Sequence, residues 1–343
     1  MNFKNYITNI VDGFPIEKGK SILLQFWGEN CDLDILNQFS LDIGKKGGIP
    51  IGIQYSREFL KDYFTNSAQE ALSFPQECID LLKSFYMVVD IFMYSPRPHE
   101  DFPTNKMSEY KKFMQNIFGS ISGAKYYLQL RVPTEELAQE EGIEFKIFNE
   151  AICNGLDVNM KELKIRGENL IDSMKDKTKV KITTKGNRVL NLDLQGRKWI
   201  NDSGDGDIPA GEVYIAPVEK AGNGEILIDK IHLEGKQYTD VICRFEEGTL
   251  VESSCNQLMD FVKRFPNGDK LSELGIGTNP KVTDCIGYSA LDEKALGTAH
   301  IALGMNAMFG GNIESPLHFD MIFKPQKLEV DDIDITKFMD NIY

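Results

Sequence analysis

The chain has 343 residues, of which 42% are hydrophobic and 26% charged; this composition is ordinary for a globular protein, and the length allows two domains. The 38 basic and 52 acidic residues give a formal net charge of −14, which argues against nucleic acid or an anionic membrane surface as the main partner. No segment approaches the roughly 18 consecutive apolar residues that a membrane-spanning helix needs.

The cysteines and the first residues indicate the compartment. Six cysteines are present, but they form no CxxC pair and their spacing shows no disulfide framework. Reduced thiols are expected in that case, as in the cytoplasm. The first residues, MNFKNYITNIVDGF, contain no apolar segment of signal-peptide length. We therefore expect a cytoplasmic protein.

The first third of the chain alternates between strand and helix patterns. Short apolar runs predict strands at Ser21–Trp27, Ile49–Ile53, Met87–Tyr94 and Tyr126–Val132. A helix pattern that starts near Asp32 separates the first two strands, and a strand–helix–strand unit implies a parallel sheet. Helical, charged sequence then continues to about Lys177. We predict an N-terminal α/β domain with a mostly parallel sheet over residues 1–178.

After residue 178 the sequence becomes rich in strands. Residues 179–194 alternate with period two around a Gly186-Asn187 turn, which predicts a β-hairpin with Leu190, Leu192 and Leu194 on one face. Further strands are predicted at Glu212–Pro217, Glu225–Leu233 and Asp240–Glu246, and a helix at Asn256–Phe265. We predict a strand-rich α+β domain over residues 179–343.

The segment SPLHFDMIF, Ser315–Phe323, contains the first candidate site residues. If it forms a strand, its apolar side chains point one way, and His318 and Asp320 point the other way side by side. His300 lies upstream in GTAHIALG, and two histidines with one carboxylate are a recurring metal-binding set. A partly buried ion pair, or a carboxylate that orients a histidine, would explain the same residues.

Two acids extend this candidate set. Glu212 opens an apolar strand after the glycine-rich loop GDGDIPAG, and Glu273 lies in SELGIGTNP beside a glycine-rich turn. Each acid could instead cap a helix or pair with a lysine or arginine. Carboxylates suit hard divalent cations, and imidazole suits zinc, cobalt, manganese or iron. Five such ligands can hold two metals with one bridging carboxylate.

Four segments in this order, GDIPAGEVYIAP, SELGIGTNP, LDEKALGTAHIALG and SPLHFD, resemble the thermophilic-type metallo-aminopeptidases, the family of aminopeptidase T and aminopeptidase S. The resemblance implies an enzyme that removes N-terminal residues from peptides with two divalent metals (zinc, cobalt or manganese), and a homodimer. It implies that the metal ligands are Glu212, Glu273, His300, His318 and Asp320. It also implies that Glu273 or Glu293 transfers the proton from a metal-activated water to the leaving amine.

The chain departs from the family at one ligand. Family peptidases supply a tyrosine soon after the histidine that matches His300, whereas this chain continues ALGMNAMFGG. The same resemblance extends to ring-cleaving dioxygenases for dihydroxypyridines, in which His300, His318 and Asp320 would hold one ferrous iron. A non-catalytic relative that binds a peptide or small molecule is the third hypothesis.

Overall fold

The structure is a computed structural model that describes residues 2–121, 123–331 and 333–339. The chain divides into two compact units, one of Met1–Leu156 with Gly204–Pro209 and the other of Asp157–Ser203 with Ala210–Tyr343. Helix α8 (Met160–Met174) therefore belongs to the second unit. The domain boundary that we expected near residue 178 stays a prediction.

The first unit contains a parallel sheet with the strand order β2-β1-β3-β4-β8. The strands are β1 (Ser21–Trp27), β2 (Ile49–Gln54), β3 (Met87–Phe92), β4 (Tyr126–Arg131) and β8 (Asp207–Ile208). The first four confirm the strands predicted from apolar runs. Strand β8 was not predicted, because two residues in a glycine-rich loop carry no strand pattern.

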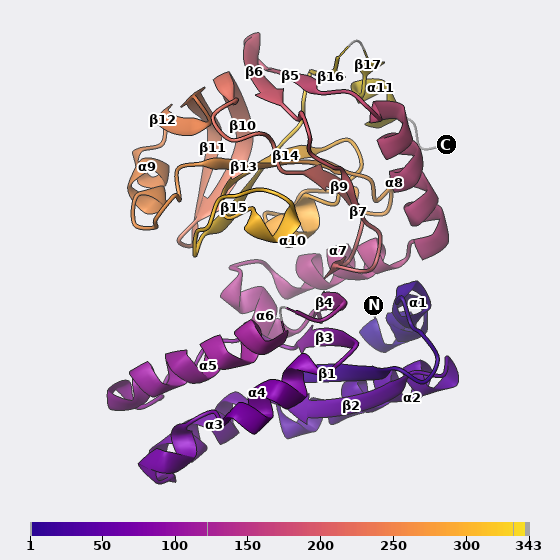
Figure 1. The fold of residues 1–343 in the computed structure, drawn as a ribbon, viewed down its shortest axis with the longest axis vertical. Helices are drawn as coiled ribbons and strands as arrows, with labels where there is room; N and C mark the ends of the chain where they lie inside the picture. The colour runs from indigo at the N-terminus through magenta and orange to yellow at the C-terminus, as the bar shows by residue number, and fades with distance from the viewer. Residues whose placement is uncertain (1, 122, 332, 340–343) are drawn as a thin grey trace. The chain divides into compact units, whose positions relative to one another are not determined.

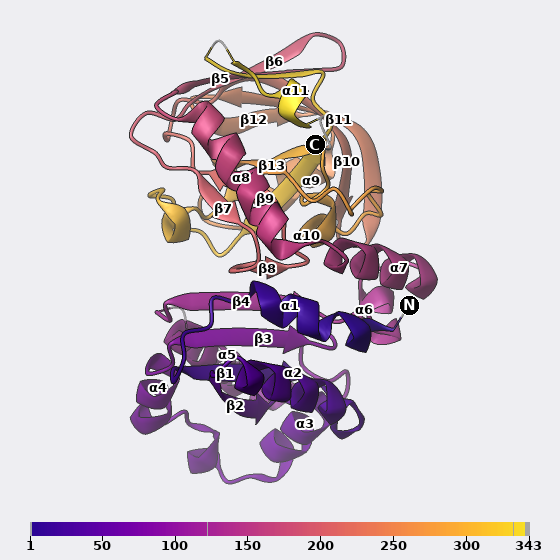
Figure 2. The same ribbon diagram turned by 90° about the vertical axis from the view of Figure 1, so that its right-hand side faces the viewer.

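Helices cover both faces of this sheet. Figure 2 shows α1 (Ile7–Gly13) and α2 (Leu33–Lys45) in front of the strands and α5 (Met107–Ile121) behind them. The remaining helices of the unit are α3 (Arg57–Asn66), α4 (Gln76–Lys83), α6 (Glu135–Glu140) and α7 (Phe145–Leu156). Because both faces are covered, every residue of β3 is buried, and all of them except Asp90 are apolar.

The second unit contains two sheets whose strands pair antiparallel (Figure 1). The larger sheet, ordered β12-β11-β10-β6-β5-β16-β17, consists of β5 (Lys179–Thr184), β6 (Arg188–Asp193), β10 (Asn223–Leu233), β11 (Lys236–Glu246), β12 (Thr249–Ser253), β16 (Lys327–Val330) and β17 (Ile333–Asp334). The smaller, ordered β15-β14-β13-β9-β7, consists of β7 (Ile200–Asp202), β9 (Glu212–Ile215), β13 (Leu271–Gly277), β14 (Ala299–Gly304) and β15 (His318–Phe323). The helices, besides α8, are α9 (Asn256–Val262), α10 (Ser289–Asp292) and α11 (Thr336–Met339).

One hydrophobic core joins the two sheets of the second unit. Leu190 and Leu192 of the larger sheet, together with the adjacent Leu194, are buried in it, as the hairpin pattern predicted. Ile301 and Met321 of the smaller sheet lie in the same core. The smaller sheet therefore turns one face toward the core, which leaves its other face available for polar side chains. None of the helices in the described ranges is long and apolar enough to cross a membrane.

Candidate metal centre

The candidate site lies on the polar face of the smaller sheet. Residues that pair across neighbouring strands carry their side chains on the same face, so the strand register shows which side chains meet. The rows on this face are Glu273–Ala302–Asp320, Gly304–His318, Gly275–His300 and Asp202–Glu212–Gly277. Residues that are distant in sequence therefore meet because of strand pairing, and alanine separates the two acids of the first row.

His318 presents one ring nitrogen to two carboxylates. Its Nδ1 atom lies 2.8 Å from the carbonyl oxygen of Met305, so Nδ1 carries the proton and donates it to that oxygen. Its Nε2 atom lies 3.3 Å from Glu273 Oε2 and 3.3 Å from Asp320 Oδ1. In a neutral imidazole this Nε2 is an acceptor that faces two further acceptors. Such a contact needs a proton or a metal cation between its atoms.

His300 repeats this arrangement deeper in the protein, where it is only 1% exposed. Its Nε2 atom lies 3.3 Å from Glu273 Oε1 and 3.4 Å from Glu212 Oε2. Within the described part of the chain, the buried atoms His300 Nδ1 and Glu212 Oε2 have no hydrogen-bond partner. Glu273 thus turns one oxygen toward each histidine, which is the orientation that a bridging carboxylate needs.

The six predicted site residues come together in the structure. Three sets of them have ligand atoms within 4.8 Å of one another: Glu273, His318 and Asp320, which we call the outer set; Glu212, Glu273 and His300, which we call the inner set; and Glu293, His300 and Asp320. None of these three sets contains both histidines. Carboxylate oxygens and imidazole nitrogens match the preferences of divalent cations, so the residues fit a metal centre. The individual roles of the six residues stay predictions.

The outer and inner sets differ in their access to solvent. In the outer set, the side chains of His318 and Asp320 are 28% and 19% exposed, respectively. In the inner set, the side chains of His300 and Glu212 are 1% and 9% exposed, respectively. Glu273, which belongs to both sets, is itself buried. A ligand from solvent therefore reaches the outer set first.

Lys294 is a site residue that the sequence analysis missed. Its side chain is completely buried, and its Nζ atom lies 2.6 Å from Glu212 Oε1 and 2.8 Å from Glu293 Oε1. Asp202 Oδ2 lies 3.8 Å from the same nitrogen. Glu212 therefore does pair with a lysine, which was one alternative for this acid, but only through its Oε1 atom. The available signal was a lysine inside the otherwise apolar and glycine-containing segment that follows Glu293.

Burial and mutual contacts shift the pKa values of the site in opposite directions. Burial raises the pKa of Glu212 to about 8. Burial also acts on Asp320, but the neighbouring His318 outweighs it and lowers the pKa of Asp320 to about 2. For His300, burial favours the neutral form, yet the hydrogen bond to Glu273 and the nearby acids raise its pKa to about 9. The site therefore has a strong affinity for positive charge.

Two glycines of β13 make room for the site. A Cβ atom at Gly275 would lie within 2.8 Å of three ring atoms of His300, because the imidazole rests directly on this residue. A Cβ atom at Gly277 would lie 2.8 Å from Thr298 Oγ1. Only glycine lets the histidine and the loop before β14 approach the strand this closely.

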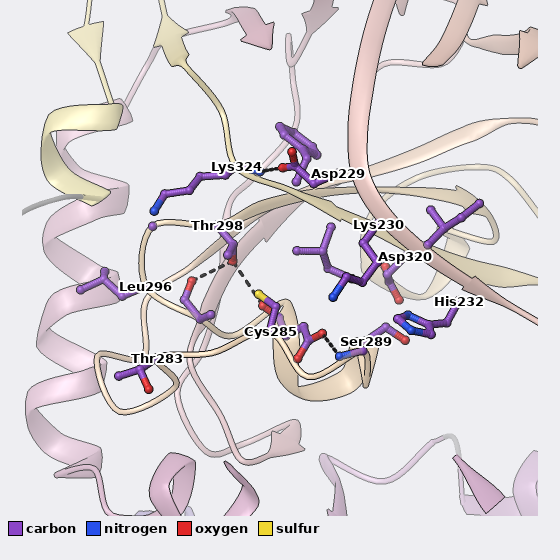
Figure 3. Close-up of a pocket in the computed structure, with 17 residues that line it drawn as sticks. Asp229, Lys230, His232, Thr283, Cys285, Ser289, Leu296, Thr298, Asp320 and Lys324 are labelled. Atoms are coloured by element: carbon purple, nitrogen blue, oxygen red, sulfur yellow. Dashed lines mark hydrogen bonds between the residues drawn. The ribbon is translucent and has the colours of Figure 1, made fainter. Parts of the chain in front are cut away.

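A cavity of about 210 Å³ lies beside the carboxylate of Asp320 (Figure 3). It is lined by residues of β10, by the loop that leads to α10, and by the end of β15. Lys230, Cys285 and Ser289 contribute polar side chains to its wall. The cavity gives the outer set a neighbouring space in which part of a small ligand fits.

Two solved structures have a similar fold. Wild-type AmpT from Thermus thermophilus matches with a TM-score of 0.69 and 16% sequence identity, over 95% of this chain and 94% of that chain. The 2,5-dihydroxypyridine dioxygenase from Pseudomonas putida KT2440 matches with a TM-score of 0.61 and 14% identity, over 97% of this chain and 94% of that chain. At these identities the likeness shows the fold alone. No curated protein sequence matches this chain.

The sequence itself matches a family. The family model described as thermophilic metalloprotease (M29) matches residues 4–334, which is nearly the whole chain. It covers every candidate ligand of the site described above. The chain belongs to the thermophilic metalloprotease family M29.

Proposed function

We propose that this protein is a metal-dependent aminopeptidase, which hydrolyses N-terminal residues from peptides. The observation that carries the proposal is the orientation of His318, whose Nε2 lone pair faces two carboxylates while Nδ1 donates to a carbonyl oxygen. A hydrogen bond from Nδ1 to a carbonyl oxygen usually fixes the tautomer of a metal-binding histidine. Membership of a metalloprotease family supports the same reading.

The metal is expected to be zinc, cobalt or manganese. The outer set of Glu273, His318 and Asp320 is the position that we propose first, because it is closest to solvent and to the cavity. The family resemblance implies a second position, for which the inner set of Glu212, Glu273 and His300 offers the ligand atoms, with Glu273 shared. A bound metal supplies an electrophile for the scissile carbonyl and activates water near neutral pH.

The acids of the site would handle the proton. Glu273 or Glu293 accepts a proton from the attacking water and returns it to the leaving amine. Both are at most 6% exposed, so a proton held there exchanges slowly with bulk solvent. Replacement by glutamine separates their roles: a metal ligand loses metal, whereas a proton carrier loses turnover and keeps the metal.

The free N-terminus of a peptide carries a positive charge, which suits this surrounding. Asp320 belongs to the outer set and also lines the cavity of about 210 Å³. An α-ammonium group placed beside the acids is attracted to their negative charge. A blocked N-terminus loses this attraction, which gives the reaction its preference for chain ends.

The test compares free and blocked substrates. The protein is stripped with a chelator, supplied with zinc, cobalt or manganese, and assayed with aminoacyl anilides and their N-acetylated counterparts. We expect metal-dependent hydrolysis of the free substrates and little of the acetylated ones. No turnover with any of the three ions, or equal rates on both substrate forms, refutes the proposal.

The structure gives less support to an iron dioxygenase. That reaction was expected to use His300, His318 and Asp320, but each set of mutually close ligand atoms contains only one histidine. The likeness to a dioxygenase structure is a likeness of fold. Oxygen uptake on dihydroxylated rings after anaerobic loading with ferrous iron would reverse this preference. A protein that retains no metal would instead indicate the non-catalytic relative.

We also propose that the protein works in the cytoplasm and as a homodimer. All six cysteines are free thiols, which suits a reducing compartment. The dimer follows from the family resemblance. Sedimentation analysis of the purified protein tests it, and a monomer at micromolar concentration would contradict it.

A further inference from the structure

A completely buried lysine beside a metal centre requires an explanation. Lys294 follows α10, and its backbone is fixed on both sides: its N–H donates to Leu291 and its carbonyl accepts from Asn279. Its side chain is 0% exposed. Burial of an ammonium group is costly unless acids surround it, and a lysine has three donors and no acceptor.

The surrounding acids meet this requirement. The ammonium of Lys294 lies 2.6 Å from Glu212 Oε1 and 2.8 Å from Glu293 Oε1, with Asp202 Oδ2 at 3.8 Å. The two shorter distances are those of charge-assisted hydrogen bonds. Asp202 and Glu212 are cross-strand partners, so the register of β7 and β9 presents both acids to the same nitrogen.

The lysine uses a carboxylate that a second metal would need. The inner set requires Glu212, and one oxygen of Glu212 already accepts from Lys294. A divalent ion on the other oxygen would place two further positive charges beside a buried ammonium, and their repulsion is strong in a buried site. The other contacts of the inner set, from His300 Nε2 to Glu212 Oε2 at 3.4 Å and to Glu273 Oε1 at 3.3 Å, require only a proton on this nitrogen.

The outer set has a different composition. Glu273, His318 and Asp320 are distinct from the three acids around Lys294, and two of them are partly open to solvent. We propose that Lys294 is a permanent cation of this site, which takes the place of the inner metal, so that each chain binds a single exchangeable divalent ion at the outer set. This inference rests on the proposed metal centre but not on the aminopeptidase reaction.

Metal content tests the inference without reference to activity. The whole chain is stripped with a chelator, dialysed separately against zinc, cobalt and manganese ions, and analysed for bound metal per chain. We expect one equivalent in the wild type. Two equivalents overturn the inference, and zero equivalents with all three ions overturn the metal centre on which it rests.

Lys294→Ala provides the decisive variant. Removal of the ammonium releases Glu212 and Glu293 and opens space, so bound metal should rise from one equivalent to two. Lys281→Ala is the matched control, because Lys281 belongs to the same unit but its side chain is 50% exposed. The control should stay at one equivalent. A folded Lys294→Ala protein that also stays at one refutes the proposed role of the lysine.

A second variant keeps the inference testable if Lys294→Ala does not fold. Glu212→Gln should leave one equivalent bound, because Glu212 serves the lysine and not the exchangeable ion. Asp320→Asn should reduce bound metal at least tenfold. Loss of one equivalent in Glu212→Gln would show that the inner set holds a metal. A chain with one metal that fails to hydrolyse aminoacyl anilides would refute the aminopeptidase and leave this inference intact.

Discussion

The substitution Gly275→Ala adds a single methyl group beneath the imidazole of His300. Its Cβ would lie within 2.8 Å of three ring atoms, whereas ordinary contacts between carbon atoms are about 3.5–4.0 Å. The nearest ring atom would lie 2.0 Å from this Cβ, so the ring has to move by roughly 1.5 Å, several times the tolerance of about 0.2 Å for a metal–ligand distance. It then loses its contact with Glu273 Oε1, at present 3.3 Å from His300 Nε2.

The expected cost has two parts. Overpacking of a buried position costs about 1–3 kcal/mol in the free energy of unfolding. Loss of a residue that orients a ligand weakens metal binding by about 10–100-fold. The measurements are urea unfolding of the metal-free protein and titration of that protein with zinc or manganese. Because His300 orients Glu273 even if it contacts no metal, this result does not depend on the number of ions.

A matched control separates the site from the general effect of a new methyl group. Gly44 lies in α2, and a Cβ built there meets nothing within 4 Å. Gly44→Ala should change stability by at most about 1 kcal/mol, in the stabilising direction, because alanine favours a helix. It should leave metal affinity unchanged. Wild-type metal affinity and stability in Gly275→Ala would refute the reasoning. Contact between the His300 ring and Gly275 would then not be needed to position the ring.

Three further predictions concern proton transfer, pH and metal removal. Glu293→Gln should keep its metal and lose about 10²–10⁴-fold in kcat, whereas Glu273→Gln should lose the metal itself. Metal analysis together with kinetics distinguishes the two variants. A fully active Glu293→Gln protein would exclude Glu293 as the proton carrier. Burial raises the pKa of Asp90 to about 6, so the folded state favours its protonated form, and the stability from this group is lost as pH rises from about 4 through 6. The shift in the pKa of Asp90 corresponds to about 3 kcal/mol in the free energy of unfolding, and Asp90→Asn should remove this pH dependence. A difference in stability between wild type and Asp90→Asn that does not vary with pH would contradict the prediction. Chelation of a metal present at about 100 times its Kd should lower the free energy of unfolding by about 2.7 kcal/mol, and an unchanged Tm would contradict this.

The fold was predictable where burial shapes the sequence. Strand β1 is mostly apolar because helices cover both faces of its sheet, and its predicted limits, Ser21 and Trp27, are the observed ones. The alternation in β15 also held, since Met321 and Phe323 lie in the core while His318 and Asp320 face the site. A periodic pattern of burial leaves a periodic pattern of residues, and this can be read from one sequence.

The site was predictable only in part, because its partners meet through strand register. The sequence contained candidate acids and histidines but did not show that Glu273 would turn one oxygen to each histidine. Lys294 was missed because a lysine near an acid is usually exposed, and only the packing of the loop shows that it is buried. Strand β8 was missed for another reason: its position depends on β4, which lies far earlier in the sequence.

Strand β8 has a consequence for any attempt to divide this protein. Residues Gly204–Pro209 belong to the first compact unit although they are surrounded in sequence by the second, so no single cut yields both units whole. A fragment that ends at residue 178 would lack β8 and leave the outer edge of β4 without its partner. Exposed edge strands promote aggregation, so a truncated first unit is a poor reagent, and studies of the metal centre are best made on the uncut polypeptide.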